Sequence, residues 1–267
     1  MLSIENAKQI VDEIMVPAAL AAGDLLKKEF YKRDFAINQK SGQSDLVTEI
    51  DLKSSNLINS ILKGMAPNIP IIDEEDEVIT KFDNIELAFI VDPLDGTLNF
   101  VHGLTEFTVS LGLVYKGKPL AGVVYHPVLE DLFSGVDKLG SWKNGKEIKV
   151  GDEKSLSECL VGSGVPYDPN IRESSFIKPF QLLMNKVREI RLLGSAALAL
   201  CYVASGQLSG FYEYDLSPWD VAGATAIILG AGGSVLPIKD NTSFIFDGTI
   251  VAGNSIIAPL LKRELNI

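Results

Sequence analysis

Apolar residues change their spacing several times along the chain, and each spacing predicts a different element. Residues 5–30 carry apolar side chains at intervals typical of one helix face, and Pro17 is expected to kink or interrupt that helix. A second amphipathic pattern predicts a helix over about residues 51–63. Short continuous apolar runs at residues 69–72 and 87–91 instead predict buried strands. Each of these strands leads directly into acidic residues.

The spacing becomes strictly alternating from about residue 106 to residue 150, which predicts an antiparallel meander with a hairpin turn at Lys116-Gly117-Lys118. After Ser155, strand-like and helical runs alternate, and this order indicates helices layered on a sheet. The strand-like runs are 160–165, 189–192 and 208–213, and the helical runs are about 172–187, 195–205 and 218–230. We therefore expect an N-terminal half, 1–154, with an antiparallel sheet and a C-terminal half, 155–267.

Composition favours a soluble cytoplasmic protein. The chain has 267 residues, of which 46% are hydrophobic, so it can bury a sizeable core as one large domain or two packed ones. It contains no long uncharged apolar window that would span a bilayer, and acidic residues near the N-terminus do not fit a signal peptide. Cys159 and Cys201 lie in apolar sequence without metal-site spacing, which predicts buried reduced thiols.

Charge excludes some classes of function. The net charge of −11 argues against electrostatic binding to nucleic acid, which requires basic surface. An anionic substrate remains possible because bound metal ions can reverse the sign of a site locally. The two histidines, His102 and His126, are isolated in the sequence, so neither a His-rich zinc site nor a Ser-His-Asp triad is indicated. Oxygen-ligand chemistry is what remains.

The strongest candidate for such chemistry follows the strand at 87–91. Asp92 and Asp95 flank Pro93, and Gly96 and Thr97 come next. Pro93 fixes its own φ angle and Gly96 permits angles that other residues avoid, so both carboxylates are held rigidly at a strand end. Hard divalent cations such as Mg²⁺ prefer oxygen ligands of this kind. Asp, Pro and Gly also dominate ordinary turns, and the stretch alone does not separate the two interpretations.

A second acidic strand end strengthens the metal interpretation. The apolar run at 69–72 leads into five consecutive acids, residues 73–77. Such a run is usually a solvated face, yet like charges gathered at a strand end also suit a cation. If the two strands lie side by side, Glu74 or Glu75 would face Asp92 and Asp95 across one crevice.

Three helix starts carry residues with both a structural and a functional interpretation. Thr48 or Asp51 is a plausible N-cap of the second helix. The stretch 194–196 begins a helix after a strand, which suits either an anion or close packing by small residues. Asp220 lies in the first turn of an apolar helix, where it is commonly a dipole partner. A buried carboxylate at that position would need a partner, which a metal ion could supply.

These residues together carry a resemblance to a known family. Asp92-Pro-Leu-Asp-Gly-Thr97 with Leu98-Asn-Phe100 resembles the first signature of the inositol monophosphatase family, and Trp219-Asp-Val-Ala-Gly223 with Ala231-Gly-Gly233 resembles its second. Further matching stretches occur in the family's order and spacing: Asp45-Leu-Val-Thr48 through Asp51, Glu74-Glu75, Gly122-Val-Val-Tyr125 and Gly194-Ser-Ala196. The resemblance covers nearly the whole chain.

The resemblance implies a fold and a metal centre. The fold would be the layered αβαβα sugar-phosphatase type, with an antiparallel sheet in the first half and a smaller mixed sheet with helices in the second. Two or three Mg²⁺ ions are implied. The first would be held by Glu74, Asp92 and the backbone carbonyl of Leu94, and the second by Asp92, Asp95 and Asp220. A weaker third ion would involve Glu74.

The resemblance also implies catalytic and substrate-binding residues. Thr97, hydrogen-bonded toward Asp51, would orient and help to deprotonate the attacking water, with Glu74 assisting. The expected substrate-binding residues are Asp95, Gly96, Thr97, Gly194, Ser195, Ala196, Glu213 and Asp220. The expected partner is a small inositol or sugar phosphate, and the expected assembly is a homodimer. Neither nucleic acid nor a membrane is expected as a partner.

Some features leave alternatives open. Asp73 replaces a glycine common in the family, and Asp76 follows the paired glutamates; these extra charges either alter metal affinity or point to solvent. Leu98-Asn-Phe100 favours the inositol or general sugar-phosphate branch over a 3′(2′),5′-bisphosphate nucleotidase, while fructose-1,6-bisphosphatase activity is not excluded. The haloacid-dehalogenase type of phosphatase needs Asp-x-Asp, whereas two residues separate Asp92 from Asp95. A non-catalytic cation-binding module is the remaining alternative.

Overall fold

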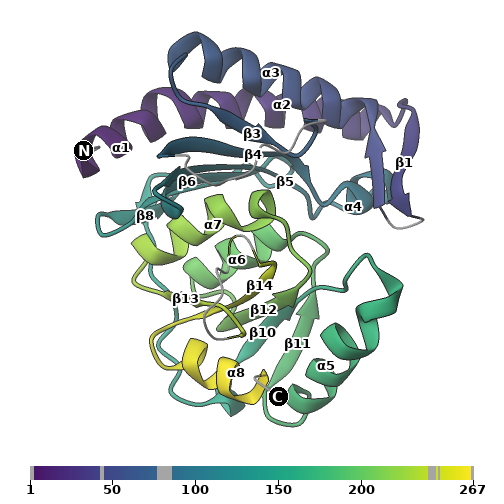
Figure 1. Cartoon of the computed structure of the whole chain (residues 1–267), viewed down its shortest axis with the longest axis vertical. Helices are drawn as coiled ribbons and strands as arrows, with labels where there is room; N and C mark the ends of the chain where they lie inside the picture. Colours follow the sequence, from purple (N-terminus) through teal and green to yellow (C-terminus); the bar gives the residue numbers. More distant parts are fainter. Residues whose placement is uncertain (1–2, 43–44, 77–85, 240–244, 246, 266–267) are drawn as a thin grey trace.

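The chain folds into five alternating layers of helices and sheets, as Figure 1 shows. The computed structural model describes residues 3–42, 45–76, 86–239, 245 and 247–265, so Ser44 and Glu77 lie outside the described residues. Helices cover the outer face of each of two large sheets, and two further helices lie between the sheets. The layered αβαβα architecture that the family resemblance implies is therefore confirmed.

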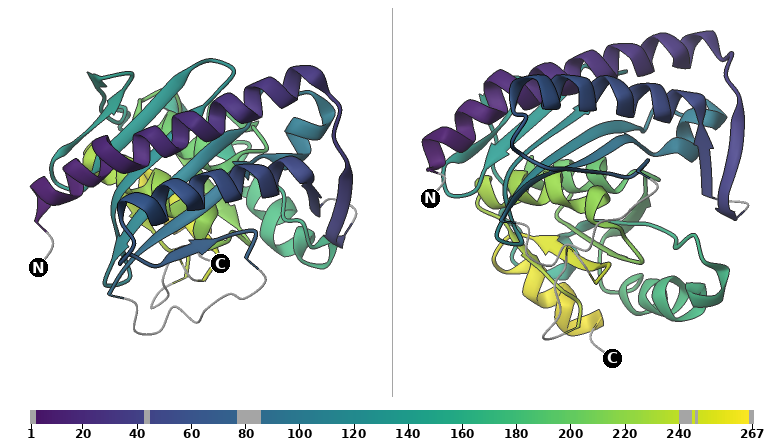
Figure 2. Two further views of the ribbon diagram at one scale, coloured as in Figure 1. Left: turned by 90° about the horizontal axis from the view of Figure 1, so that it is seen from above. Right: turned by 45° about the horizontal axis from the view of Figure 1, so that its top comes forward.

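The first layer is a long N-terminal helical segment beside a second helix. The segment comprises α1 (Ile4–Ile10), the π-helical turn η1 (Val11–Met15) and α2 (Val16–Lys32), and α3 (Glu49–Met65) lies alongside it (Figure 2). The expected interruption at Pro17 takes the form of this π turn, in which the Val16 N–H donates to the Val11 carbonyl. Between α2 and α3, β1 (Ile37–Gly42) and β2 (Asp45–Thr48) form an antiparallel pair.

The second layer is the larger sheet, whose strands follow the order β3-β4-β5-β6-β7-β8-β9. Their bounds are β3 (Ile71–Asp73), β4 (Leu87–Asp95), β5 (Thr108–Tyr115), β6 (Lys118–His126), β7 (Asp131–Val136), β8 (Gly140–Lys143) and β9 (Lys146–Glu147). β3 pairs with β4 in parallel, and every later pair is antiparallel, which confirms the predicted meander. Lys116 and Gly117 both have positive φ angles, as a two-residue hairpin turn requires.

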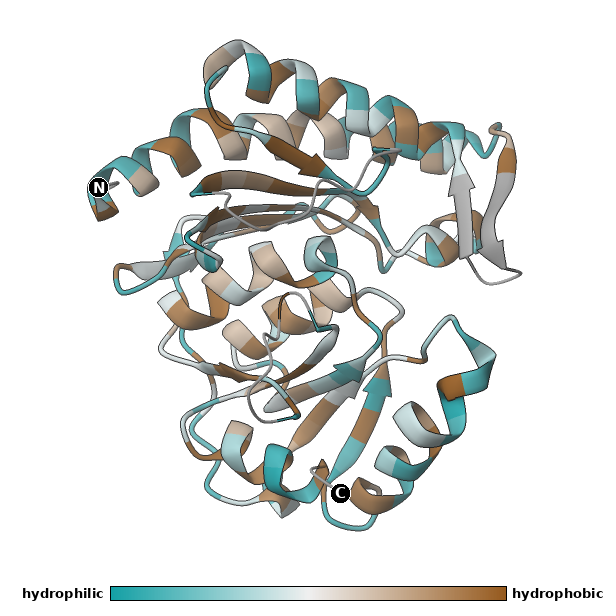
Figure 3. Cartoon of the chain, viewed as in Figure 1, coloured by the Kyte–Doolittle hydropathy of each residue, from teal (hydrophilic) through white to brown (hydrophobic). Residues whose placement is uncertain are grey.

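The third layer is formed by α6 (Ala196–Ala204) and α7 (Pro218–Gly230). Every residue of α7 from 221 to 228 is buried, because the helix contacts the larger sheet on one side and α6 on the other. Figure 3 shows the consequence: α6 and α7 are apolar around much of their circumference, whereas the outer helices carry polar stripes. A Cβ on Gly122 would lie 1.9 Å from the Gly223 carbonyl oxygen, and a Cβ on Gly223 would lie 2.7 Å from the Leu111 carbonyl oxygen, so α7 approaches β6 and β5 this closely only because these residues are glycine.

The fourth layer is a smaller sheet with the strand order β11-β10-β12-β14-β13. Its strands are β10 (Leu160–Ser163), β11 (Glu189–Leu192), β12 (Gly210–Tyr214), β13 (Ser234–Leu236) and β14 (Thr249–Gly253). β10 pairs with β11 and β12 in parallel, and β14 pairs with β12 and β13 antiparallel. The sheet is therefore mixed, as expected.

The outer helices of this sheet are short. The last layer contains α5 (Lys178–Leu183) and α8 (Ile257–Leu265), together with η2 (Leu156–Glu158), η3 (Pro169–Ile171) and η4 (Glu173–Ile177). The single helix predicted over 172–187 is thus wrong in detail, because a π turn and α5 replace it and the helix ends at Leu183. The predicted strand over 160–165 likewise ends at Ser163, ahead of an irregular segment that contains Gly164 and Pro166.

The remaining whole-chain expectations concern the cysteines and membrane spans. Cys159 and Cys201 are free and buried, as predicted, and burial raises the pKa of the Cys159 thiol to about 11. Across the described residues we find no helix with the length and apolar character needed to traverse a lipid bilayer.

Candidate active site

The two acidic strand ends lie next to each other. β3 and β4 are parallel neighbours in a register that pairs Asp73 with Val91, and the Glu74 N–H donates to the Val91 carbonyl at 3.1 Å. Glu74 therefore leaves β3 beside the position where Asp92 lies on β4. The expectation that these strands lie side by side is confirmed.

Asp92 is the most deeply buried acid of the site, with 1% of its surface exposed. One carboxylate oxygen, Oδ1, accepts a hydrogen bond from the Leu94 N–H at 3.0 Å. Burial raises the pKa of Asp92 well above its usual value, and the negative charges of Glu74, Asp95 and Asp220 raise it further. Acids from three separate stretches of the chain thus act on one carboxylate, and the charged groups with the largest effects on it are all negative.

Asp95 connects β4 to α6. Its Oδ2 accepts hydrogen bonds from Thr108 Oγ1 at 3.0 Å, from the Ala197 N–H at 3.1 Å and from Ser195 Oγ. Burial is the largest influence on Asp95 and raises its pKa to about 6, against the opposing effect of these hydrogen bonds. Ser195 is also the N-cap of α6, because its Oγ accepts from the Leu198 N–H at 3.2 Å. The same hydroxyl therefore caps the helix and donates a hydrogen bond to Asp95.

Asp51 makes two separate sets of hydrogen bonds, one with each carboxylate oxygen. It forms a capping box with Thr48 at the start of α3, in which its Oδ2 accepts from the Thr48 N–H at 2.8 Å and from Thr48 Oγ1 at 2.6 Å. Its second oxygen, Oδ1, accepts from Thr97 Oγ1 at 3.0 Å. Thr97 Oγ1 also lies 3.0 Å from the Leu94 carbonyl oxygen. The Thr97–Asp51 contact expected from the resemblance is therefore present in the structure.

Gly96 shapes the turn between β4 and the short helix α4 (Thr97–His102). Its φ angle is 92°, and a Cβ at this position would lie 2.8 Å from the Glu106 carbonyl oxygen. Downstream, Asn99 Nδ2 donates to the carbonyls of Glu106 at 2.7 Å and Leu193 at 2.8 Å. Asn99 thereby joins the turn after β4 to the loop that precedes α6.

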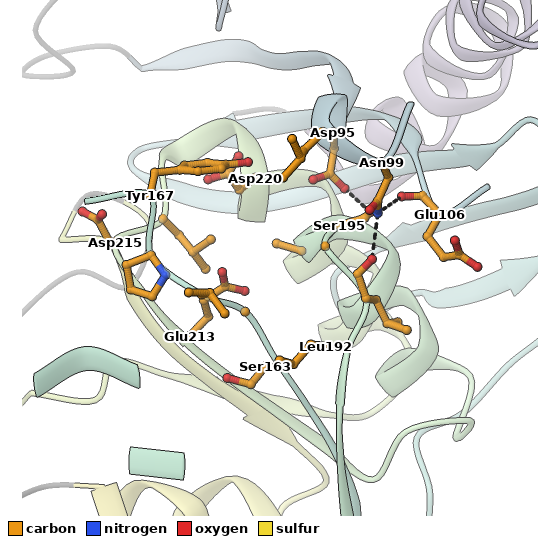
Figure 4. Close-up of a pocket in the computed structure, with 18 of the residues that line it drawn as sticks. Asp95, Asn99, Glu106, Ser163, Tyr167, Leu192, Ser195, Glu213, Asp215 and Asp220 are labelled. Carbon is orange, nitrogen blue, oxygen red and sulfur yellow. Dashed lines mark hydrogen bonds between the residues drawn. The ribbon is translucent and has the colours of Figure 1, made fainter. Parts of the chain in front are cut away.

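A cavity of about 470 Å³ opens between the two sheets beside these acids (Figure 4). Six of the residues predicted to bind substrate or metal line it: Asp95, Gly194, Ser195, Ala196, Glu213 and Asp220. The other predicted site residues, Asp51, Glu74, Asp92, Leu94, Gly96 and Thr97, are not part of its lining. Burial, followed by the charges of Asp220 and Asp95, raises the pKa of Glu213 well above its usual value.

Tyr167 is the main lining residue that the sequence analysis missed. In Figure 4 its hydroxyl points toward Asp220, although 53% of the residue is exposed. Burial of the hydroxyl end and the charges of Asp220, Asp95 and Glu74 raise its pKa. Arg172 fixes this loop, because its Nε donates to the Pro166 carbonyl at 3.0 Å. The available signal was positional: Tyr167 follows the carboxyl end of β10, the edge where ligands of such sheets commonly bind.

The donor chemistry of the site suits a divalent cation. Mg²⁺ takes carboxylate oxygens as ligands. The charged groups that influence the pKa of the buried Asp92 most strongly are all acidic, so a cation would be attracted to this position. In the described part of the chain, however, no three His, Cys, Asp or Glu side chains already form a group that could hold an ion. Like charges repel, and the Leu94 and Ser217 N–H groups hold one oxygen of Asp92 and of Asp220, respectively.

Comparison with known proteins identifies what the chain is similar to. A family model described as "Inositol monophosphatase family" matches residues 7–266. The chain is 41% identical to inositol monophosphatase 1 of Solanum lycopersicum over 95% of this chain and 94% of that protein. It is 34% identical to Nus factor SuhB of Pseudomonas aeruginosa, over 91% and 90% of the two chains. The solved inositol monophosphatase of Anabaena (Nostoc) superposes with a TM-score of 0.85 at 33% identity, covering 96% and 95%.

Proposed function

The chain belongs to the inositol monophosphatase family, and on this premise we propose that it is a Mg²⁺-dependent phosphomonoesterase. The proposed reaction hydrolyses inositol monophosphate or a related sugar phosphate to the alcohol and inorganic phosphate. The observation that carries this proposal is the parallel pairing of β3 with β4, which places Glu74 beside the buried Asp92, together with the negative charges of Asp95 and Asp220 that act on the same carboxylate. Acids that are far apart in the sequence gather beside a cavity large enough for a small phosphate ester.

We assign the metal ligands as the resemblance implies. Glu74, Asp92 and the Leu94 carbonyl would hold one Mg²⁺, and Asp92, Asp95 and Asp220 a second, with a weaker third ion at Glu74. Bound divalent ions would lower the pKa of water and neutralise charge that develops on the transferring phosphoryl group. The all-oxygen donor set and the acidic surroundings of Asp92 support this assignment.

Thr97 and Asp51 would prepare the attacking water. Thr97 Oγ1 lies within hydrogen-bond distance of Asp51 Oδ1, so the hydroxyl can accept from water while it donates to the carboxylate. Asp51 is held in place by its two bonds from Thr48, which fixes the orientation of the pair. Glu74 would assist in deprotonation. The water oxygen then bonds to phosphorus, the ester P–O bond breaks, and the leaving oxygen takes a proton.

The cavity would bind the rest of the substrate. The Gly96 and Thr97 N–H groups are assigned to the phosphate. Glu213 would accept hydrogen bonds from sugar or inositol hydroxyls, because its carboxylate is directed to the cavity and packs against Gly164, where a Cβ would lie 2.0 Å from Glu213 Oε1. Gly194, Ser195 and Ala196 would line the same pocket together with Asp95 and Asp220.

Two alternative activities are tested alongside the proposed one: fructose-1,6-bisphosphatase activity and 3′(2′),5′-bisphosphate nucleotidase activity. The net charge of −11 disfavours direct binding of nucleic acid by this chain. We also propose a cytoplasmic location and a homodimer.

A non-catalytic cation-binding module would not need the Thr97–Asp51 pair in addition to the metal ligands.

Phosphate release from a substrate panel tests the proposed function. The panel comprises inositol 1-phosphate, fructose 1,6-bisphosphate and 3′-phosphoadenosine 5′-phosphate, each assayed with Mg²⁺ and with EDTA. We expect the highest kcat/KM for the inositol phosphate and complete loss of turnover in EDTA. Turnover that persists in EDTA would contradict metal dependence. Absence of release from every ester, alongside binding of Mg²⁺, would favour the non-catalytic module.

A further inference from the structure

Asp73, which stands where the resemblance implies a glycine, is buried beside the turn that carries Glu74. Only 2% of its surface is exposed, so of the two alternatives left open for Asp73 and Asp76, pointing to solvent applies to Asp76 and not to Asp73. Its Oδ2 accepts from Ser55 Oγ at 2.8 Å and from Asn59 Nδ2 at 2.9 Å. Its Oδ1 accepts from the Glu75 N–H at 2.9 Å. One carboxylate therefore connects helix α3 to the backbone of the turn that carries Glu74.

The α3 residues that make these contacts belong to a polar stripe along the helix, formed by Asp51, Ser54, Ser55 and Asn59. Their spacing of three, four and eight residues from Asp51 places them on one face of the helix. That face meets both acidic strand ends, because Ser54 Oγ donates to the Pro93 carbonyl at 2.8 Å while Ser55 and Asn59 donate to Asp73. Helix α3 thereby holds the end of β4 and the end of β3 at once.

We propose that Asp73 is a positioning residue that fixes the turn bearing Glu74 for Mg²⁺ binding. The inference rests on the proposed function and deepens it. β3 is only three residues long, so beyond the Glu74 N–H bond to the Val91 carbonyl the turn depends on support from outside the ladder. Asp73 supplies that support through its side-chain bond to the Glu75 N–H, and its backbone carbonyl accepts from the Asp76 N–H at 3.2 Å. Both the side chain and the backbone of Asp73 thus accept hydrogen bonds from the turn, and α3 holds the Asp73 carboxylate through Ser55 and Asn59.

The competing explanation is that Asp73 acts only through its negative charge. The chain contains a matched control for this explanation, because Asp76 lies on the same turn, carries the same charge and is exposed. If charge alone mattered, neutralising either acid would weaken cation binding to a similar degree. If position matters, only the change at Asp73 should do so, since Asp73 holds the side-chain bonds to α3 and to Glu75.

The experiment compares Asp73→Asn with Asp76→Asn in the full-length chain. Two quantities are measured: the Mg²⁺ concentration for half-maximal phosphate release, and the Mg²⁺-induced rise in Tm without substrate. In Asp73→Asn we expect half-saturation to require about 10- to 100-fold more Mg²⁺, the usual effect of losing a residue that orients a metal ligand. Asp76→Asn should stay within about twofold of wild type. The substrate KM at saturating Mg²⁺ should be unchanged in both variants.

Ser55→Ala keeps the proposal testable should Asp73→Asn fail to fold. It removes one donor to Asp73 without changing any charge, and a weaker shift in the same direction is expected. Equal shifts in Asp73→Asn and Asp76→Asn, or wild-type Mg²⁺ dependence in a folded Asp73→Asn or Ser55→Ala variant, would overturn the proposal. A wild-type chain that releases no phosphate would refute the proposed function, while the Tm measurement would still decide the role of Asp73.

Discussion

Asp92→Asn is expected to lose at least about 10³-fold in metal-dependent turnover without destabilising the fold. Removing this charge should cost several kcal/mol of transition-state stabilisation, because Asp92 is assigned to both metal sites. Asparagine keeps the size of the side chain and an oxygen that can accept from the Leu94 N–H. The measurements are kcat/KM for the preferred ester, and Tm with EDTA and with Mg²⁺.

The Tm measurements show whether the negative charge of Asp92 serves metal binding or stabilises the fold. In wild type, burial and three neighbouring acids raise the pKa of Asp92, so its ionised form costs folding free energy at neutral pH. In EDTA the variant should therefore have a Tm equal to or above that of wild type, while the Mg²⁺-induced rise in Tm should disappear. Asp76→Asn is the control with the same charge change on an exposed residue. Near-normal turnover in Asp92→Asn would remove this residue from the metal site.

Thr97→Val should reduce turnover by about 10²-fold or more while leaving Mg²⁺ binding intact. Valine matches the shape of threonine but cannot orient water or donate to Asp51 Oδ1, and general-base contributions typically fall between about 10² and 10⁴. Loss of the hydroxyl's hydrogen bonds should cost about 1 kcal/mol in the free energy of unfolding. Turnover, the Mg²⁺-induced rise in Tm and urea unfolding are measured on the same preparations.

Thr97→Ser is the matched variant, because it keeps the hydroxyl and removes only the methyl group. Its turnover should lie close to that of wild type. This pair is cleaner than a change at Asp51, which would also remove part of the capping box that begins α3. Wild-type turnover in Thr97→Val would show that the hydroxyl has no part in the reaction, and a loss confined to Thr97→Ser would show that packing of the methyl group matters instead.

The parts of the site that the sequence predicted are those whose determinants are local. An apolar strand followed by acids identified both strand ends, and the spacing of Thr48 and Asp51 identified the start of α3. The parallel pairing of β3 with β4 then brought Glu74 beside Asp92, as expected. Alternation and turn residues were sufficient for the meander from β5 to β8, because each strand pairs with its neighbour along the chain.

The parts that escaped prediction depend on contacts between distant segments. The residues around Asp73 in the sequence do not indicate that Ser55 and Asn59 donate hydrogen bonds to its carboxylate. A run of five acids instead favours a solvated face. Tyr167 was missed because its loop reaches the acids only when the two sheets pack against α6 and α7. β13 pairs with β14 across an intervening stretch, and β13 has only three residues, too few to show a period.

Diffraction from crystals soaked in Mn²⁺, recorded for its anomalous signal, tests most directly whether the separated acids share metal ions. The account predicts anomalous peaks within coordination distance of Asp92 and Asp95, with Glu74 and Asp220 rotated to complete the shells. Asp92→Asn crystals treated in the same way should lose these peaks. Peaks confined to surface carboxylates, with the four acids still apart in soaked wild-type crystals, would contradict the account.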